Sequence, residues 1–176
     1  MGQGIRAVAI TLSDACARGE RADESGVVLV ELLRELGAEI VATEVLSDDL
    51  EPLKNQLLMY AGRADVNLIL TTGGTGFSPR DNTPEATRAV IERDAPGLAE
   101  AMRAETLGKT PTAMISRGVC GIRAGTLIIN LPGAPGAVRE CFAVIRPVLG
   151  HAVALMAGRS HDEARDVETK NNVSST

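Results

Sequence analysis

The sequence predicts an α/β fold: a single three-layer domain with a mostly parallel sheet, helices on both faces of it, and a β-hairpin. Three observations predict this fold. The 176 residues suit one globular domain, which we expect to span residues 1–158. Hydrophobic residues make up 44% of the chain and aromatic residues only 2%, so the core must be aliphatic, as buried parallel strands require. Short apolar runs also alternate with segments of helical periodicity.

The first half of the chain reads as strand, helix, strand, helix and strand. Short apolar runs at residues 6–12, 39–46 and 66–72 predict the three strands. After a polar loop, Ser25 is the expected N-cap of the first helix, and Gly37 the residue that ends it. Its inward-facing residues are expected to be Val27, Val28, Val30, Leu32 and Leu33. The second helix begins with acidic cap candidates at 47–49 and has leucines at helical spacing, at positions 50, 53, 57 and 58.

The second half predicts three helices and the hairpin. Thr83 is the expected N-cap of a helix at 83–94, with proline in its first turn, and another helix is expected at 95–108. Residues 118–131 predict two strands joined by a tight turn at 123–125. A long amphipathic helix should end near Gly158. Residues 159–176 are polar and are predicted to form a flexible tail.

Composition argues against several classes of function. The net charge of −5 disfavours a nucleic-acid-binding surface. No apolar stretch is long enough for a membrane span and no targeting signal is complete, so we expect a cytoplasmic protein. The cysteines, Cys16, Cys120 and Cys141, are odd in number and lack metal-ligand spacing, which predicts reduced thiols rather than a zinc site.

The segment TTGGTG at residues 71–76 joins the third strand to a helix. Glycines let backbone N–H groups approach an anion, and at least one is expected to take a positive φ. The lysine of a phosphate-binding P-loop is missing, and Pro79 stands where the dinucleotide fingerprint needs its third glycine. The segment therefore predicts either a phosphate cradle or only a tight turn between strand and helix.

Carboxylates lie beside this loop. A carboxylate at Asp81 would repel phosphate unless a divalent cation lay between them, which suggests magnesium; alternatively, Asp81 caps the helix that follows. Asp48 and Asp49 follow the second strand and are either ligands or ordinary helix-start residues. Since the carboxyl ends of parallel strands share one edge, these loops should converge with Ser13-Asp14 and with NLPGAP at 130–135.

Two further polar positions leave alternatives open. Arg117, beside a predicted strand, either clamps an anion through two N–H groups or forms a surface ion pair. Asn130 either contacts the polar edge of a ring or bonds only to the backbone of its own loop.

Together, the stretches NLILTTGGTGFSPRDNTPEATRAVIERDAPGL and MISRGVCGIRAGTLIINLPGAPGAV resemble the Mog-type molybdopterin adenylyltransferases. The family includes the corresponding domains of gephyrin and cinnamon, and the resemblance extends from AITLSD to HAVALMAG. It implies a homotrimer of three-layer α/β domains. It also implies transfer of AMP from ATP to the terminal phosphate of molybdopterin, with release of pyrophosphate and with Mg²⁺ as cofactor.

By position, the resemblance makes Asp48 and Asp81 the catalytic pair and the magnesium ligands. The implied nucleotide and pterin pocket consists of Ser13, Asp14, Thr72, Gly73, Gly74, Thr75, Gly76, Ser116, Asn130, Pro132 and Gly133. Asn82 departs from the valine that the family commonly has after the aspartate, which would alter packing under the loop. A functional partnership with a separate or fused molybdate-insertion domain is also expected. The alternative is a pterin-binding or trimer-forming module without turnover.

Overall fold

Six strands form one sheet in the order β2-β1-β3-β6-β5-β4, in a computed structural model that describes residues 4–159. The first four in that order run parallel, and β5 and β4 add antiparallel pairs at one side. The predicted hairpin is confirmed as β5 and β6, whose turn places Ala124 and Gly125 at positive φ. Apart from its first residue, the predicted tail lies outside the described residues. The strands are β1 (Arg6–Leu12), β2 (Glu39–Leu46), β3 (Leu68–Thr72), β4 (Arg93–Asp94), β5 (Cys120–Arg123) and β6 (Thr126–Leu131).

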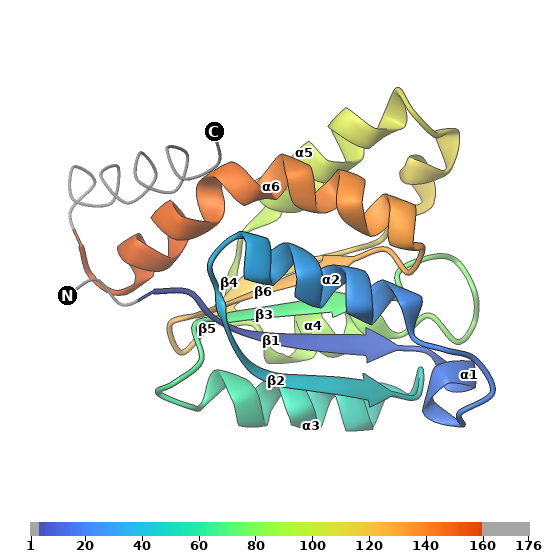
Figure 1. Cartoon of the computed structure of the whole chain (residues 1–176), viewed down its shortest axis with the longest axis horizontal. Coiled ribbons are helices and arrows are strands. Elements are labelled where there is room, and N and C mark those ends of the chain that lie inside the picture. Colours follow the sequence, from blue (N-terminus) through green and yellow to red (C-terminus); the bar gives the residue numbers. More distant parts are fainter. Residues whose placement is uncertain (1–3, 160–176) are drawn as a thin grey trace.

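Helices cover both faces of the sheet, as predicted (Figure 1). One hydrophobic cluster joins the sheet to α2, α5 and α6, and a second joins its other face to α3 and α4. The helices are α2 (Glu24–Glu35), α3 (Leu50–Ala61), α4 (Thr83–Val90), α5 (Pro96–Leu107) and α6 (Pro135–Met156). No helix of residues 4–159 is both long and apolar enough to cross a membrane.

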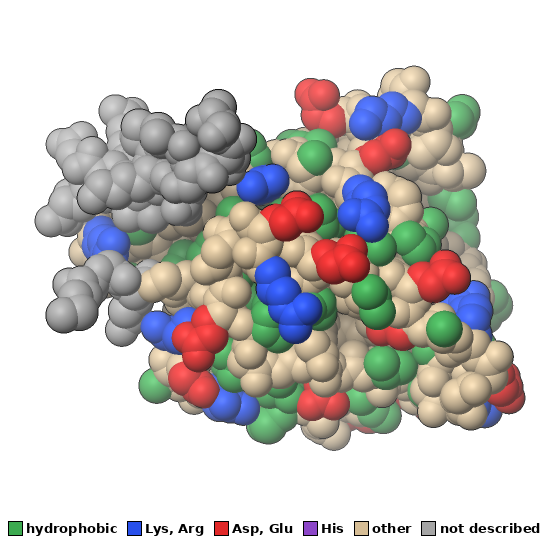
Figure 2. Space-filling view, in the orientation of Figure 1, with side chains coloured by type: hydrophobic (Ala, Val, Ile, Leu, Met, Phe, Trp, Pro, Cys, Tyr) green, Lys and Arg blue, Asp and Glu red, His purple; other side chains and the backbone are tan. Residues whose placement is uncertain are grey.

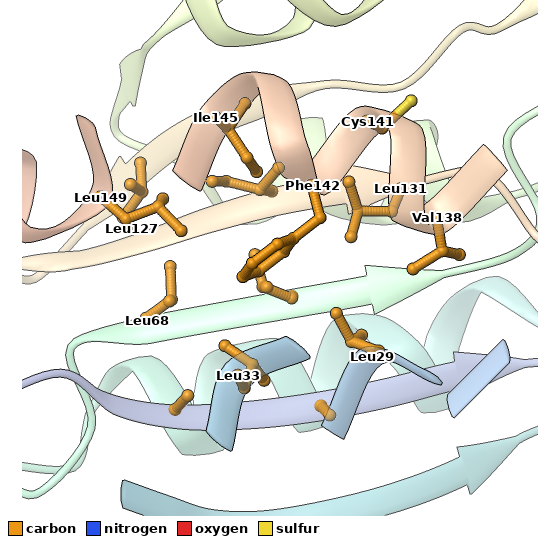
Figure 3. Packing of buried hydrophobic residues seen from close by; sticks show 14 of the residues in the cluster. Leu29, Leu33, Leu68, Leu127, Leu131, Val138, Cys141, Phe142, Ile145 and Leu149 are labelled. Atoms are coloured by element: carbon orange, nitrogen blue, oxygen red, sulfur yellow. The ribbon is translucent and has the colours of Figure 1, made fainter. Parts of the chain in front are cut away.

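The core is aliphatic on both faces because side chains alternate along each buried strand. In β3, Leu68 and Leu70 belong to the α2–α6 cluster, whereas Ile69 belongs to the α3–α4 cluster. Phe142 of α6 projects between the sheet and the leucines of α2 (Figure 3). On the face shown in Figure 2, Lys and Arg side chains lie scattered among Asp and Glu side chains rather than in one basic patch.

The start and the buried face of α2 differ from the prediction. The N-cap is Asp23, not Ser25, because the Asp23 carboxylate accepts a hydrogen bond from the Gly26 N–H at 2.8 Å. Val27, predicted to face inward, is 58% exposed, and the buried apolar stripe is instead Val28, Leu29 and Leu33. Moving the helix start by two residues explains the capping error, whereas the misplaced valine reflects an error in the assigned helical face.

The α4 region also departs from the prediction. Asn82 occupies the N-cap position, but its side chain caps no helix amide and donates instead to the Asp48 and Arg80 carbonyls at 3.0 and 3.2 Å. Thr83, the predicted cap, is the first helical residue and donates to the Gly73 carbonyl at 2.9 Å. The helix ends at Val90 rather than residue 94, because Glu92 and the residues after it pair with β5. The backbone N–H of Glu92 donates to Ile122 O at 2.9 Å.

Smaller differences concern short elements. The third strand begins at Leu68 rather than 66, because the Asn67 side chain accepts the Arg6 N–H at 2.8 Å in place of a backbone carbonyl. Two short helices, α1 (Asp14–Ala17) and η1 (Pro111–Ile115), occupy segments for which no helix was predicted.

Candidate functional site

The carboxyl ends of the parallel strands meet at one edge, where the arrowheads of β1, β2 and β3 point in Figure 1. There Asp14 and Asp48 hold each other's loops in place. The Asp14 N–H donates to Asp48 Oδ2 at 2.9 Å, and the Asp48 N–H donates to Asp14 Oδ1 at 3.1 Å. The Gly73 N–H donates to the Leu131 carbonyl at 3.1 Å. The predicted convergence of the strand-end loops is therefore confirmed.

The glycine loop adopts a conformation that requires glycine at its centre. Gly73 and Gly74 have φ values of 102° and 63°, so the expected positive φ is confirmed. A Cβ on Gly73 would lie 2.3 Å from the backbone oxygen of Leu12, at the end of β1. A Cβ on Gly133, in the NLPGAP loop, would lie 3.2 Å from the Gly73 Cα. The end of β1, the glycine loop and the NLPGAP loop thus pack backbone against backbone, with no room for a side chain between them.

A cavity of about 450 Å³ opens at this edge, and we call it the acidic cavity. Arg21 is the only Lys or Arg among the described residues that line it. The N-terminal ends of α2 and α6 also border it, and the cap residue of α6, Ala134, has no side chain that could bond to the helix amides. Its walls consist of Thr11, Leu12, Ser13, Cys16, Arg21, Ala22, Asp23, Glu24, Ser25, Asp48, Gly73, Gly74, Asp81, Gly133, Ala134 and Pro135.

Asp48 is the half-buried carboxylate at the centre of these loops. Burial raises its pKa, as do the nearby Asp14 and Asp81 carboxylates, and the hydrogen bond from the Asp14 N–H opposes this. That bond occupies Oδ2. The other oxygen, Oδ1, lies 3.4 Å from the position that a Cβ on Gly74 would take, so it is directed at the glycine loop.

Asp81 closes the glycine loop rather than capping α4. Its Oδ2 accepts the Ser78 N–H at 3.0 Å, three residues back along the chain. The first α4 amide, that of Thr83, donates instead to the Gly74 carbonyl at 3.1 Å. The same Oδ2 lies 2.9 Å from the position that a Cβ on Gly76 would take. The capping alternative is thus replaced by a carboxylate held against the loop by one of its two oxygens.

Arg80 neutralises the outer carboxylates of the edge. Its guanidinium binds Asp14 through two N–H groups at 2.8 and 3.0 Å, and Asp49 through a third at 2.8 Å. The bonds from Arg80 hold the pKa of Asp14 below its ordinary range, and the Ser47 hydroxyl, followed by Arg80, lowers the pKa of Asp49. Asp48 is not bonded to Arg80 and keeps one oxygen directed at the glycine loop.

Arg117 binds protein groups in this structure, which favours the ion-pair alternative. It pairs with Glu85 and donates to the carbonyls of Gly76 and Asp81, both at 2.7 Å. Its backbone N–H also donates to the Thr75 carbonyl at 2.8 Å. Arg117 therefore fastens both ends of the loop segment to α4 and fixes the position of Asp81.

Three of the predicted pocket residues line a different, mostly apolar pocket of about 100 Å³ between α5, η1, α6 and β6. They are Ser116, Asn130 and Pro132. Asn130 is 2% exposed, and its amide accepts the Val119 N–H and donates to the hydroxyls of Thr71 and Thr87. The Asn130 side chain is therefore occupied by protein groups, but these are not the backbone of its own loop, as the second alternative held.

The remaining predicted residues do not all line a pocket, since Asp14, Thr72, Thr75 and Gly76 line neither of the two. Ser13 lines the acidic cavity, with its hydroxyl accepting from Cys16 N–H and from Arg21. Thr72 is fully buried and donates to the Pro132 carbonyl at 2.8 Å, which joins the glycine loop to the NLPGAP loop. Thr75 is buried as well. Arg21 and Asp23 were missed, although their place in a charged segment directly after the first strand was a usable signal.

The donor set fits magnesium held jointly with a substrate. In residues 4–159, no group of three or more His, Cys, Asp and Glu residues could hold a metal ion. Mg²⁺ needs no such group, because it is usually bound by one or two carboxylates together with substrate phosphates and waters. Asp48 and Asp81 border one cavity and interact electrostatically, so they could supply the two carboxylates.

Comparison with known proteins gives one consistent family. The profile of the probable molybdopterin-binding domain matches residues 8–151. The chain is 43% identical to the molybdenum cofactor synthesis protein cinnamon of Drosophila melanogaster, over 84% of this chain but only 25% of cinnamon. It is 37% identical to the molybdopterin adenylyltransferase of Helicobacter pylori J99, over 89% of this chain and 90% of that protein.

A solved structure agrees with the sequence relatives. The molybdopterin biosynthesis enzyme MoaB from Thermus thermophilus superimposes with a TM-score of 0.83 at 46% identity, covering 88% of this chain and 98% of that one. Because the profile spans most of the chain, and relatives of similar length exceed 30% identity, the chain belongs to the MoaB/Mog family of probable molybdopterin-binding domains.

Proposed function

We propose that this protein is a molybdopterin adenylyltransferase of molybdenum cofactor biosynthesis. An oxygen of the terminal phosphate of molybdopterin attacks the α-phosphorus of ATP, the bond to the bridging α–β oxygen breaks, and pyrophosphate leaves. The observation that carries the proposal is the acidic cavity itself, where a glycine loop and two carboxylates meet at the carboxyl edge of the sheet. The names of the relatives support the same reaction.

Phosphate binding requires local donors, because the chain is negatively charged overall. Among the described residues, no hydrogen bond occupies the backbone N–H of Gly74, so it is available to an anion. The N-terminus of the 22-residue helix α6 borders the cavity without a side-chain cap. Its free N–H groups and the helix dipole favour negative charge there.

The carboxylates suit a metal-assisted nucleotidyl transfer. Asp48 and Asp81 would hold Mg²⁺, which when bound neutralises phosphate charge and thereby brings two anionic substrates together. The Asp14 N–H orients Asp48 and the Ser78 N–H orients Asp81, so both carboxylates are positioned before substrate binds. The nucleophile is a phosphate oxygen that is already ionised at neutral pH. The chain's main tasks are therefore alignment and charge neutralisation.

The apolar pocket suits the ring portion of a substrate rather than its phosphates. Ser116 and Pro132 line it, and Pro132 is followed directly by Gly133 in the acidic cavity. Asn130 supports this wall through its three buried hydrogen bonds instead of reading the ring itself.

The test offers purified protein molybdopterin, ATP and Mg²⁺ and measures pyrophosphate release together with the adenylylated product. Asp81→Asn should abolish turnover while largely sparing molybdopterin binding. Asp94→Asn is the matched control, because Asp94 is an exposed aspartate in β4 and lines neither pocket. Near-normal turnover by Asp81→Asn would show that the metal assignment is wrong.

The second candidate, a pterin-binding or trimer-forming module without catalysis, would bind molybdopterin tightly and release no pyrophosphate. The proposal also includes assembly as a homotrimer, location in the cytoplasm and cooperation with a molybdate-insertion domain, since cinnamon is far longer than this chain. Light scattering that finds only monomer at micromolar concentration would contradict the trimer.

A further inference from the structure

The segment between α1 and α2 lies beside the carboxyl ends of the strands (Figure 1), and Arg21 belongs to this segment. It lines the acidic cavity together with Gly73, Gly74 and Asp48. One of its guanidinium nitrogens, Nη2, donates to Ser13 Oγ at 3.2 Å. This bond holds a cation beside Ser13, in the wall of the cavity that the glycine loop also lines.

The charge of Arg21 is not neutralised by the protein. Within residues 4–159 it forms no ion pair, whereas Arg80 binds Asp14 and Asp49, and Arg117 binds Glu85. Its neighbour in sequence, Glu20, is bonded to Arg18, and the next carboxylate along the chain, Asp23, also has other partners. Asp23 accepts hydrogen bonds from the Thr11 hydroxyl at 2.7 Å and from the Gly26 N–H at 2.8 Å.

The geometry of Asp23 is itself constrained. A Cβ on Gly26 would lie 2.0 Å from Asp23 Oδ2 and 2.3 Å from Thr11 Oγ1, so the first turn of α2 fits tightly around that carboxylate. Asp23 therefore stays with α2, and Arg21, two residues earlier, is left with most of its N–H groups free.

We propose that Arg21 binds a phosphate group of a substrate in the acidic cavity. A guanidinium can donate two parallel N–H bonds to a phosphate, and among the described residues Arg21 is the one Lys or Arg in a cavity wall whose other charged side chains are carboxylates. The inference rests on the proposed function, which brings phosphate groups into this cavity. The phosphate comes either from the triphosphate of ATP or from the terminal phosphate of molybdopterin, and the two sources are distinguished below.

The experiment compares Arg21→Gln, Arg21→Lys and the control Arg18→Gln. Arg18 belongs to the same loop but is bonded to Glu20 and does not line the cavity, so the control removes the same charge. Calorimetry measures the Kd of Mg·ATP and of molybdopterin separately, and steady-state assays measure the KM of each substrate and kcat. Thermal unfolding shows whether each variant is folded.

Arg21→Gln should weaken binding of one substrate about ten- to a hundredfold, the range expected for a lost hydrogen bond to a charged group. Arg21→Lys should recover part of that loss, Arg18→Gln should stay within about twofold of wild type, and added salt should narrow the difference. A change confined to Mg·ATP identifies the nucleotide phosphate, and a change confined to molybdopterin identifies the pterin phosphate.

Unchanged binding and KM for both substrates in folded Arg21→Gln would overturn the inference, while turnover by the wild type would leave the proposed function standing. Conversely, wild-type protein that binds Mg·ATP more tightly than Arg21→Gln, yet releases no pyrophosphate, would support the inference and refute adenylyl transfer. Wild-type protein that binds neither substrate would overturn both.

Discussion

Gly73→Ala tests whether the close approach of the strand-end loops holds the site together. Gly73 has a φ of 102°, and a methyl group there would lie 2.3 Å from the Leu12 carbonyl oxygen. Ordinary van der Waals contact begins at 3.4 Å, so the two groups must separate by about 1 Å. Gly37→Ala is the matched control, because Gly37 also has a positive φ, of 80°, but has no atom within 4 Å of the added Cβ.

Both substitutions place a Cβ at a positive φ, but only Gly73→Ala also overpacks its surroundings. A left-handed conformation costs a residue with a Cβ about 1–2 kcal/mol, so Gly37→Ala should lower the free energy of unfolding by that amount. Gly73→Ala adds an overpacking cost of about 1–3 kcal/mol. For a chain of this length each kcal/mol corresponds to about 2–4 °C in Tm, so the Tm of Gly73→Ala should lie about 2–12 °C below that of Gly37→Ala.

Calorimetry or circular dichroism measures both Tm values, and isothermal titration measures Mg·ATP binding. Moving Gly73 also shifts the loop against which Asp48 rests, so Mg·ATP affinity should fall in Gly73→Ala and stay unchanged in Gly37→Ala. Equal Tm values for the two variants, with equal affinity for Mg·ATP, would refute the reasoning that these loops are packed backbone against backbone.

Four further predictions concern the charged side chains and the thiols. Asp48→Asn should raise Tm at pH 7, because burial raises the pKa of Asp48 and its ionised form therefore opposes folding. This gain in Tm should vanish as the pH falls through that pKa. Turnover by the same variant should fall about a hundredfold or more. Asp49→Asn should instead lower Tm slightly at pH 7 and match wild type in acid, because the pKa of Asp49 is lowered in the folded protein. If the Tm of Asp48→Asn and of Asp49→Asn varied with pH in the same way, both pKa directions would be contradicted. Arg117→Ala should lower the unfolding free energy by about 2 kcal/mol in urea titrations, because loop and helix lose their shared donor, and a loss no larger than that of Arg18→Ala would count against this role. Cys16 alone should react with a thiol reagent in the native protein, because the other two cysteines are buried; release of more than one equivalent without unfolding would disprove it.

The sequence predicts the parallel strands well because their signal is local. Short runs such as that at 6–12 are apolar throughout, as strands covered on both faces must be, and their bounds differ little from those observed. The edge strand β4 gave no such signal. Arg93 and Asp94 are both exposed and polar, and they form a strand only because β5 lies beside them. An element created by its partner cannot be read from its own residues.

In the candidate site, too, some features can be predicted from the sequence and others depend on the packed structure. The meeting of Asp14 with Asp48 follows from strand order, because each residue comes two positions after the end of a parallel strand. The role of Asn130 does not, since its hydroxyl partners lie 59 and 43 residues away in sequence. Asn130 bonds to protein groups because it is buried, and buried polar side chains are normally hydrogen-bonded. The NLPGAP motif alone does not show that Asn130 is buried.

The distribution of charge is compatible with the proposed binding of anions in an acidic cavity. Arg80 neutralises the two outer carboxylates, and the hydroxyl and amide donors around Asp23 stabilise its charge within α2. Two carboxylates at the glycine loop, Asp48 and Asp81, then remain, each with one oxygen held by a backbone amide of the protein. Phosphate alone would meet repulsion from them, and a divalent cation alone would find too few ligands among residues 4–159. Each therefore needs the other, and the cavity should bind magnesium and phosphate together far more tightly than either one separately.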